Sequence, residues 1–335
     1  MRRAVSRLSR PRVACVGLGW IGRHRLQALT EQHLVDVVAV ADADPAAREQ
    51  ARAIVPEARA FASFDEALAL APDGVVLATP SAMHAEQSIR ALDAGAAVFC
   101  QKPLGRDAAE VHRVLDAARR TNRLLAVDVS YRFTQGLRQL HDLAREGAIG
   151  DIYAIDLVFH NAYGPDKAWF RDPQLAGGGC AIDLGIHLVD LALWTLGQPE
   201  VTNVTSRLYA RGRPLAQGAS EVEDYAVAQL DLASGAVVRL VCSWNLPAGC
   251  DCVIEAHFHG DKAGAAMRNV NGSFYDFTAE RNEGTRRAVL ATPPDAWGGR
   301  AIVDWAKRLG AGSGYSSSIE SAIQVAAVLD RIYGR

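Results

Sequence analysis

The sequence predicts an α/β protein of two domains, an N-terminal doubly wound parallel sheet and a C-terminal α+β domain with a large, mainly antiparallel sheet. Near residue 13 a short apolar strand runs into a G-x-G-x-x-G turn that opens an amphipathic helix. Strands and helices then alternate to about residue 128, as in parallel sheets covered on both faces. From Ile152 onward, longer runs with partial alternation are separated by turns, which is typical of antiparallel strands.

The glycine turn contains Gly17, Gly19 and Gly22, and it encloses Trp20 and Ile21. The first glycine allows a tight turn, the second lets the backbone approach a pyrophosphate, and the third lets helix and strand pack closely. This pattern indicates a Rossmann-type dinucleotide site, and we expect all five residues to lie at the cofactor. Trp20 can cover the cofactor, reach toward the substrate or pack at the domain interface.

Asp42 supports this interpretation and indicates which dinucleotide binds. It ends a second apolar strand about twenty residues beyond Gly22, where a carboxylate meets the ribose hydroxyls. The next residues are Ala43 and Asp44, so no adjacent arginine would neutralise a 2′-phosphate. An uncompensated carboxylate about 4 Å from that phosphate would cost roughly 4 kcal/mol at an effective dielectric of about 20. The sequence therefore favours NAD over NADP; the alternative is a structural turn beside a solvated Asp42.

The rest of the first domain continues the alternation. In order, the predicted elements are a capping box at 63–66 that opens a short helix, a strand at 74–78 closed by Thr79-Pro80, a helix over about 84–94, a strand at 97–100 before Lys102-Pro103, a helix begun at 107–110, and a strand at 124–127. We expect an NAD-binding domain over 13–128 after a disordered basic tail over 1–12. The tail carries five arginines, but no apolar region follows it as in a signal peptide.

The second domain is expected over 129–335, as the substrate-binding domain. Its predicted strands are 152–160, 201–210, 225–232, 237–244 and 253–258. One strong helix, from Ile182 to about Leu196, interrupts them. A last helix over 319–333 can pack back on the first domain.

Composition excludes several classes of function. The formal charge is −2 and 49% of the residues are hydrophobic, so there is no basic footprint for nucleic acid. We expect no apolar run of membrane-spanning length and no membrane partner. The six cysteines lie mostly in apolar runs without zinc-site spacing, which favours reduced thiols in a cytoplasmic protein.

Lys102 is the first candidate for catalysis. It follows a strand of the parallel sheet, and the carboxyl ends of such strands line the ligand crevice. A cationic nicotinamide ring and partial desolvation would both disfavour the ammonium form, which suits proton transfer. The alternative is a charged turn with no role in catalysis.

A glycine-rich stretch, Gly177 to Gly179 followed by Asp183 and His187, is the second candidate. The glycines let backbone and substrate approach closely, and the helix puts Asp183 and His187 four residues apart on one face. His187 suits the proton that leaves a hydroxyl while hydride leaves the same carbon. Asp183 can orient the imidazole or hold a neighbouring hydroxyl. Such a pair is also common in ordinary helices and in metal sites.

A third region has side chains suited to line the substrate-binding site. Arg132 follows the last parallel strand, and a later loop carries Tyr163, Trp169 and Arg171. Aromatic rings that pack on C–H faces, beside polar groups that meet hydroxyls, fit a polyol. The alternative is a partly buried aromatic cluster at the domain junction.

Together these motifs resemble the Gfo/Idh/MocA oxidoreductase family, which includes glucose-fructose oxidoreductase and inositol dehydrogenase. The motifs that carry the resemblance are the glycine turn, Thr79-Pro80 with His84, Lys102-Pro103, Arg132, and the G-G-G-x-x-x-D-x-G-x-H stretch that ends at His187. The resemblance implies a Rossmann domain followed by an α/β domain whose open sheet makes homodimers or homotetramers. It implies a catalytic set of Lys102, Asp183 and His187, with Thr79, Pro80 and His84 around the dinucleotide.

Position 101 departs from the family pattern. The family usually has E-K-P, whereas Gln101 precedes Lys102 here. A neutral amide cannot stabilise an ammonium as a carboxylate would, so we expect either a lower pKa of Lys102 or different hydrogen bonds to cofactor and lysine. We count Gln101 among the cofactor-binding residues.

The sequence thus predicts an NAD-dependent dehydrogenase that transfers hydride between nicotinamide and a secondary hydroxyl or ketone of a sugar, cyclitol or sugar derivative. His187, assisted by Lys102, would move the hydroxyl proton. One alternative is a glycoside hydrolase that oxidises its substrate transiently with retained NAD; another is a non-catalytic, dinucleotide-dependent regulator. A zinc site of His160, Asp183 and His187 is a further rival, but the spacing matches no metal signature and we predict no metal.

Overall fold

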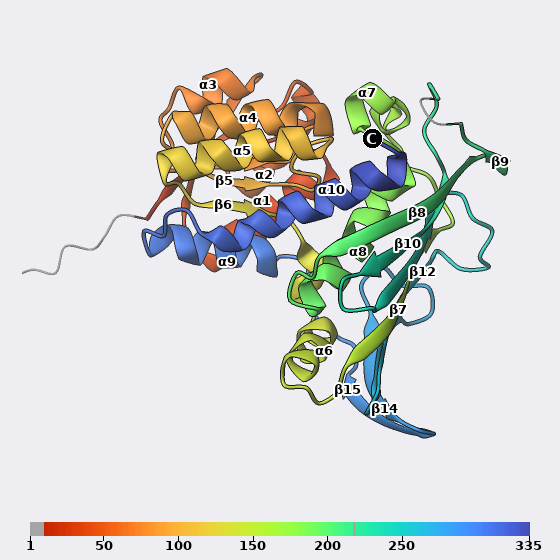
Figure 1. Ribbon diagram of the computed structural model, residues 1–335. Coiled ribbons are helices and arrows are strands. Elements are labelled where there is room, and N and C mark those ends of the chain that lie inside the picture. Colours follow the sequence, from red (N-terminus) through yellow and green to blue (C-terminus); the bar gives the residue numbers. More distant parts are fainter. Residues whose placement is uncertain (1–9, 217–218) are drawn as a thin grey trace, which may run out of the picture.

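The computed structural model describes residues 10–216 and 219–335, and it divides them between two sheets (Figure 1). Most of the tail predicted over 1–12 lies outside the described residues. Its last part is ordered, because Arg12 begins the first strand and Arg10 Nη1 lies 3.5 Å from Asp36 Oδ1.

The first sheet is parallel, with the strand order β3-β2-β1-β4-β5-β6. Its strands are β1 (Arg12–Val16), β2 (Asp36–Ala41), β3 (Arg59–Phe61), β4 (Gly74–Leu77), β5 (Ala97–Cys100) and β6 (Leu125–Val127). Strands β4 and β5 are buried along their whole length, as expected for a sheet covered on both faces. The strand order reverses at β1, so the carboxyl ends of β1 and β4 form the ligand crevice.

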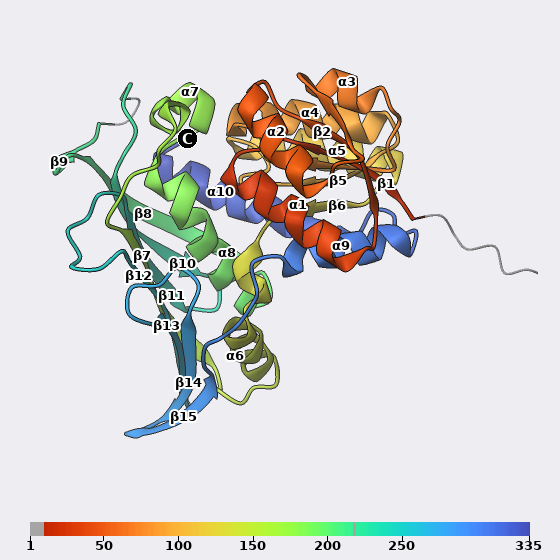
Figure 2. The same cartoon turned by 180° about the vertical axis from the view of Figure 1, so that it is seen from behind.

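Helices cover both faces of this sheet (Figures 1 and 2). One face carries α3 (Phe64–Leu68), α4 (Ser81–Asp93) and α5 (Ala108–Thr121), and the other carries α1 (Trp20–Gln32), α2 (Pro45–Ile54) and α9 (Arg300–Gly310). The capping box predicted at the start of α3 is present: the Ser63 hydroxyl accepts the N–H of Glu66, whose carboxylate accepts the N–H of Ser63.

Helix α9 returns from the far end of the chain to complete the first domain, which the sequence did not predict. Its Trp305 is fully buried, with its ring 5.9 Å from that of Phe99 on β5. A Cβ on Gly74 would lie 2.8 Å from the Trp305 ring, so β4 needs glycine at this contact. The first hydrophobic core is therefore closed by residues more than 200 positions downstream.

The second sheet has nine strands in the order β15-β14-β13-β12-β7-β11-β10-β8-β9, and it is antiparallel except between β7 and β11. Its strands are β7 (Ile152–Asn161), β8 (Val201–Ala210), β9 (Arg213–Pro214), β10 (Tyr225–Leu232), β11 (Val237–Ser243), β12 (Cys252–Gly260), β13 (Gly264–Asn269), β14 (Phe277–Glu283) and β15 (Arg286–Ala291). The predicted strands of the second domain are all present, and β13 to β15 extend the sheet beyond them.

One face of this sheet packs against helices, and the other is open (Figures 1 and 2). The remaining helices are η1 (Ser130–Phe133), α6 (Gln135–Arg145), η2 (Ala168–Arg171), α7 (Pro173–Ala176), the π-helical turn η3 (Ala181–Gly185), α8 (Ile186–Thr195), η4 (Ser317–Glu320) and α10 (Ser321–Tyr333). The helix expected from Ile182 is thus a π-turn that continues into α8.

Two apolar helical segments lie between the domains. Helix α10 contacts both α5 and α8, and Asp330 on α10 accepts the backbone N–H of Ala108 at the start of α5. The segment Pro173–Thr195 has the length and mean hydropathy, 1.4, of a membrane span, contrary to the expectation from the sequence. However, 83% of its most apolar window is buried inside the protein, as in a core helix.

We expect Trp305→Ala to lower the free energy of unfolding by about 3–5 kcal/mol, because it leaves a cavity between α9 and the parallel sheet. Urea unfolding followed by circular dichroism measures the change. As a control, Glu49→Ala removes a side chain that is 79% exposed and should change the free energy by less than about 0.5 kcal/mol. Equal losses for the two variants would contradict the role given to α9.

Candidate active site

A cleft of about 1420 Å³ opens at the carboxyl ends of β1 and β4 and reaches the η3–α8 segment of the second domain. Ten of the eleven predicted cofactor residues line it: Gly17, Gly19, Trp20, Ile21, Asp42, Thr79, Pro80, His84, Gln101 and Lys102. Gly22 lies beneath the turn, where a Cβ would come within 1.9 Å of the Gly17 carbonyl oxygen. The structure therefore brings the predicted cofactor residues together on one surface.

The glycine turn has the geometry that a dinucleotide requires. Gly17 has a φ of +84°, and a Cβ there would lie 2.4 Å from the Ala78 carbonyl group. A Cβ on Gly19, in contrast, would meet nothing within 4 Å. The space above Gly19 is thus open to a pyrophosphate at the N-terminus of α1, where backbone N–H groups favour an anion.

Asp42 is held in place at the end of β2. Its Oδ2 accepts the N–H of Leu18 at 2.6 Å, and its Oδ1 accepts the N–H of Asp44 at 2.9 Å. Each carboxylate oxygen keeps a lone pair for a ribose hydroxyl. The open turn and this oriented carboxylate together fit an NAD(P) cofactor.

His84 joins two turns at the edge of the cleft. Its Nδ1 lies 2.7 Å from the Pro103 carbonyl oxygen and its Nε2 lies 2.7 Å from the Thr79 carbonyl oxygen. Burial lowers the pKa of this imidazole, although both hydrogen bonds favour its charged form. Since both ring nitrogens face protein carbonyls, His84 holds the Thr79 and Pro103 turns together.

Lys102 and Asp183 form an ion pair across the two domains. Lys102 Nζ donates to Asp183 Oδ1 at 2.6 Å and to the Asp183 backbone carbonyl at 2.7 Å. The other carboxylate oxygen of Asp183 accepts the indole N–H of Trp244 at 3.1 Å. Asp183 therefore orients Lys102, and in the described chain it makes no hydrogen bond to His187, which corrects one of the roles expected for it.

His187 is positioned by aromatic packing. Its ring meets that of Tyr131 edge to face, with centroids 4.9 Å apart and planes at 67°. Burial and the nearby charge of Lys102 hold the pKa of the imidazole well below its usual range. The ring is consequently neutral at pH 7 and able to accept a proton.

The three glycines before the catalytic helix are explained by packing within the protein. A Cβ on Gly178 would lie 2.1 Å from the Tyr333 hydroxyl, and a Cβ on Gly179 would lie 2.0 Å from the Glu223 backbone oxygen. The sequence instead suggested that they let the substrate approach. Gly178 thus packs against Tyr333 of α10 and Gly179 against Glu223, just before β10, while Gly177 has a φ of +89° and a Cβ there would lie 2.8 Å from Arg106.

Glu223 anchors the start of the same helical segment. Its buried carboxylate accepts the backbone N–H groups of Gly179 and Ala181, at 3.0 and 2.8 Å, and the hydroxyl of Tyr333 at 2.7 Å. A carboxylate at the N-terminus of a helix is stabilised by the unpaired N–H groups there. Glu223 and Tyr333 together fix the segment that carries Asp183 and His187.

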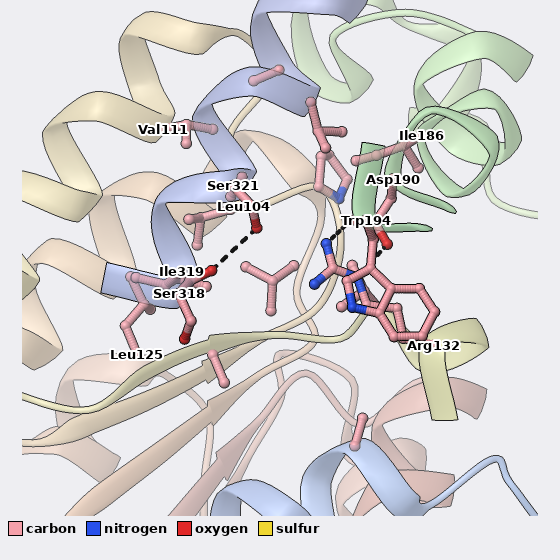
Figure 3. A pocket seen from close by; sticks show the side chains of 18 of the residues that line it. Leu104, Val111, Leu125, Arg132, Ile186, Asp190, Trp194, Ser318, Ile319 and Ser321 are labelled. Carbon is pink, nitrogen blue, oxygen red and sulfur yellow. Dashed lines mark hydrogen bonds and ion pairs between the residues drawn. The ribbon is translucent and has the colours of Figure 1, made fainter. Parts of the chain in front are cut away.

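Arg132 was expected at the substrate but lies on a second cavity of about 500 Å³ (Figure 3). Its Nε donates to Asp190 Oδ2 at 2.7 Å, and its Nη2 donates to Asp190 Oδ1. Its guanidinium also lies 5.6 Å from the centre of the Trp194 ring. Asp190 lies one helical turn after His187 on α8, so Arg132 anchors the helix next to the position of His187.

Of the three loop residues expected at the substrate, Trp169 lines the cleft, whereas Tyr163 and Arg171 do not. Trp169 lines the cleft and stacks on Phe170, with ring centroids 3.8 Å apart. Tyr163 is half exposed and donates its hydroxyl to Asp251 outside the cleft. Arg171 also lies outside the cleft lining, beside Gly164, so substrate contacts of these two residues stay a prediction that the lining of the cleft does not support.

Several residues of the cleft were missed because they come from segments without a motif. Tyr275 and Trp297 line the cleft, and the Trp297 indole donates to the Tyr275 carbonyl at 2.9 Å. The Trp297 ring also lies 5.0 Å from that of Tyr131, which itself packs on His187. Their aromatic character was the only signal available in the sequence.

The residues considered for zinc do not converge. His160 Nδ1 lies 2.7 Å from the Ser243 hydroxyl, whereas Asp183 is held by Lys102 and Trp244. Within residues 10–216 and 219–335, no group of three His, Cys, Asp or Glu side chains is arranged to hold a metal ion.

Two family models match the chain. The oxidoreductase family with an NAD-binding Rossmann fold matches residues 11–129, and the GFO/IDH/MocA C-terminal domain matches residues 137–266. Among curated proteins, D-glucoside 3-dehydrogenase of Escherichia coli (strain K12) is 30% identical over 272 residues, which cover 76% of each chain.

Solved structures share the whole fold. GenD2 from gentamicin A biosynthesis, in complex with NAD, is 26% identical with a TM-score of 0.80, and the match covers 99% of this chain and 96% of that one. KijD10, a 3-ketoreductase from Actinomadura kijaniata in complex with NADP and TDP-benzene, has a TM-score of 0.81 at 21% identity over 97% of both chains. This fold is therefore found with either dinucleotide.

Gly19→Ala should weaken NADH binding by about tenfold or more without a loss of stability, because the added methyl group meets only the space left for the pyrophosphate. Fluorescence titration with NADH and thermal unfolding of the free protein measure the two effects. An unchanged NADH affinity would show that the cofactor binds elsewhere.

Proposed function

This chain belongs to the Gfo/Idh/MocA oxidoreductase family, and on that premise we propose that it oxidises a secondary hydroxyl of a sugar, cyclitol or sugar derivative, or reduces the corresponding ketone, with NAD. The observation that carries the proposal is the convergence of Lys102 and His187 on the cleft formed by the glycine turn. The activity in the name of the E. coli relative, dehydrogenation of a glucoside, supports this substrate class.

His187 and Lys102 would have different roles at the substrate hydroxyl. When bound, the nicotinamide supplies the hydride acceptor or donor. His187 is neutral because burial and Lys102 lower the pKa of its ring, so it accepts the hydroxyl proton. Lys102 uses two of its three N–H donors on Asp183, and the third would bind the substrate oxygen and stabilise its developing negative charge.

The preference for NAD rests on the charge at the end of β2. Asp42 would lie close to a 2′-phosphate and repel it. Two arginines come near: Arg48 on α2 donates its Nη1 to the backbone carbonyls of Asp42 and Ala43, at 2.7 and 3.1 Å, and Arg23 donates its Nη1 to the backbone carbonyl of Leu18. In the described chain both guanidinium groups bind backbone carbonyls and neither forms an ion pair with Asp42, which supports the assignment of the preference to that carboxylate.

We also propose that copies of the chain associate through the open face of the nine-stranded sheet. Val227, Val241 and Val158 form a row on this face, since Val227 pairs with Val241 and Val241 with Val158 in adjacent strands. In each strand, the residues directly before and after the valine are buried and point into the core. An apolar row on an uncovered sheet is a natural contact for a second copy.

The enzyme should prefer NAD⁺ over NADP⁺ by at least about 100-fold in kcat/KM, because repulsion of a few kcal/mol separates the two cofactors. Asp42→Ala should reduce this preference by increasing activity with NADP⁺. Arg48→Ala is the matched control, since it should leave the preference unchanged. Wild-type protein that uses NADP⁺ equally well, or loses that use on Arg48→Ala, would overturn the assignment.

His187→Asn should lower kcat by about 10²- to 10⁴-fold, because it removes the proton acceptor, while the affinity for NADH stays within about twofold. Growth of NADH absorbance with a panel of glycosides, sugars and cyclitols identifies a substrate and then measures kcat. His33→Asn is the control, because His33 is exposed and its left-handed backbone, with a φ of 51°, suits asparagine.

The pH profile tests the same assignment. Oxidation needs neutral His187, whose pKa is lowered, so kcat/KM should stay level as the pH falls from about 8 to about 6.5 and decline only at lower pH. A decline that starts above pH 7, or His187→Asn protein with full activity, would sink the proposed role.

A further inference from the structure

Gln101, the residue that departs from the family pattern, is buried beside a second carboxylate. It is 8% exposed, and its side-chain amide donates to Asp128 Oδ2. Asp128 is 2% exposed and directly follows β6. Its Oδ2 also accepts from Arg25 Nε at 2.5 Å, and its Oδ1 accepts from the Ser130 hydroxyl.

Arg25 connects this group to both sides of the cleft. It lies on α1, the helix that begins at the glycine turn, and is 5% exposed. Its Nη2 donates to the Ser130 hydroxyl at 2.9 Å, and its Nη1 donates to the Gly298 carbonyl at 2.5 Å. Arg25, Gln101, Asp128 and Ser130, which we call the Arg25 cluster, all line the cleft.

We propose that the Arg25 cluster positions Lys102 and the Trp297–Gly298 segment relative to α1, and that Asp128 supplies the carboxylate that residue 101 lacks. The inference rests on the proposed function, because it assigns positioning residues to that active site. On one side, Gln101 holds the backbone that leads into Lys102. On the other, Arg25 holds Gly298, and the adjacent Trp297 packs on Tyr131, which in turn packs on His187.

Charge balance explains why residue 101 is neutral. The cluster holds one cation, Arg25, and one anion, Asp128, and both are buried. A glutamate at position 101 would place a second carboxylate against Asp128 Oδ2, and two buried carboxylates that share one site cannot both ionise. One of them would take up a proton, or the contact would break. Gln101 and Asp128 are therefore a matched pair, in which the donor amide fits the carboxylate.

Three variants test this pairing. Gln101→Glu keeps the shape of the side chain and adds the second carboxylate, whereas Gln101→Glu combined with Asp128→Asn restores a single carboxylate on the other partner. Gln27→Glu is the matched control: Gln27 also donates its amide to a carboxylate, that of Glu31 at 3.0 Å, but the pair is exposed on α1. Each protein is assayed for kcat/KM at about pH 6 and about pH 8, and for NADH affinity and thermal unfolding.

We expect Gln101→Glu to lose at least about tenfold in kcat/KM at pH 8, and to recover much of that loss at pH 6, where the new carboxyl is protonated and can donate to Asp128. Its unfolding temperature should also fall as the pH rises, since protonation of the added group favours the folded state. The double variant should regain kcat/KM at pH 8, and Gln27→Glu should match the wild type.

The proposal is overturned by a Gln101→Glu protein with the wild-type pH profile, by an equal loss at both pH values, or by a double variant no better than the single one. A change in unfolding temperature without a change in kcat/KM would leave the cluster a purely structural role and would also overturn it. If no sugar or cyclitol is turned over by the wild type, the proposed function fails separately. The coupling between positions 101 and 128 is then read from unfolding and NADH affinity, which need no substrate.

Discussion

The active site depends on one ion pair between Lys102 of the parallel sheet and Asp183 of the second domain. A partly buried pair of this kind is stable only when its remaining donors and acceptors are also satisfied. Here the backbone carbonyl of Asp183 takes a second lysine donor, and Trp244 satisfies the other carboxylate oxygen. Because one partner comes from each domain, the same contact ties the strand end that precedes Lys102 to the helical segment that carries His187.

Supports on both sides keep this pair in register. Arg132 binds Asp190, one turn after His187 on α8, and Glu223 accepts the first N–H groups of the helical segment. The lysine side is held by the His84 bridge between the Thr79 and Pro103 turns. Rigid support of this kind is what a hydride transfer needs, since donor, acceptor and base must all be aligned at once.

Local patterns in the sequence were sufficient for much of the fold. The glycine turn, the strand ends and the capping box depend on neighbouring residues, and the structure confirms them. Helix α9 and strands β14 and β15 were missed for different reasons. Helix α9 packs on the first domain through a contact between Trp305 and β5, and residues this far apart in the sequence give no local pattern that predicts it. Strands β14 and β15 carry many charged residues, as strands near the edge of a sheet often do, and so lack a clear apolar pattern.

The candidate site residues also differ in whether a local sequence pattern was sufficient to place them. Lys102 and His187 were found because each follows a recognisable strand end or glycine motif, and both line the cleft. Arg132 and Tyr163 were misplaced because the direction of a side chain depends on packing that sequence spacing does not record. Aromatic rings beside polar groups suggested substrate contacts, but in the structure Arg132 pairs with Asp190 and Tyr163 donates to Asp251.

The clamp formed by Glu223 and Tyr333 has a consequence for the synthesis of the protein. The helical segment that it fixes begins near residue 180, but the phenol that completes the clamp arrives about 150 residues later. While the chain grows on the ribosome, the glycine stretch and the Glu223 carboxylate must wait for α10 before the segment can be locked. Assembly of the catalytic centre therefore has to await the synthesis of α10, whose Tyr333 completes the clamp.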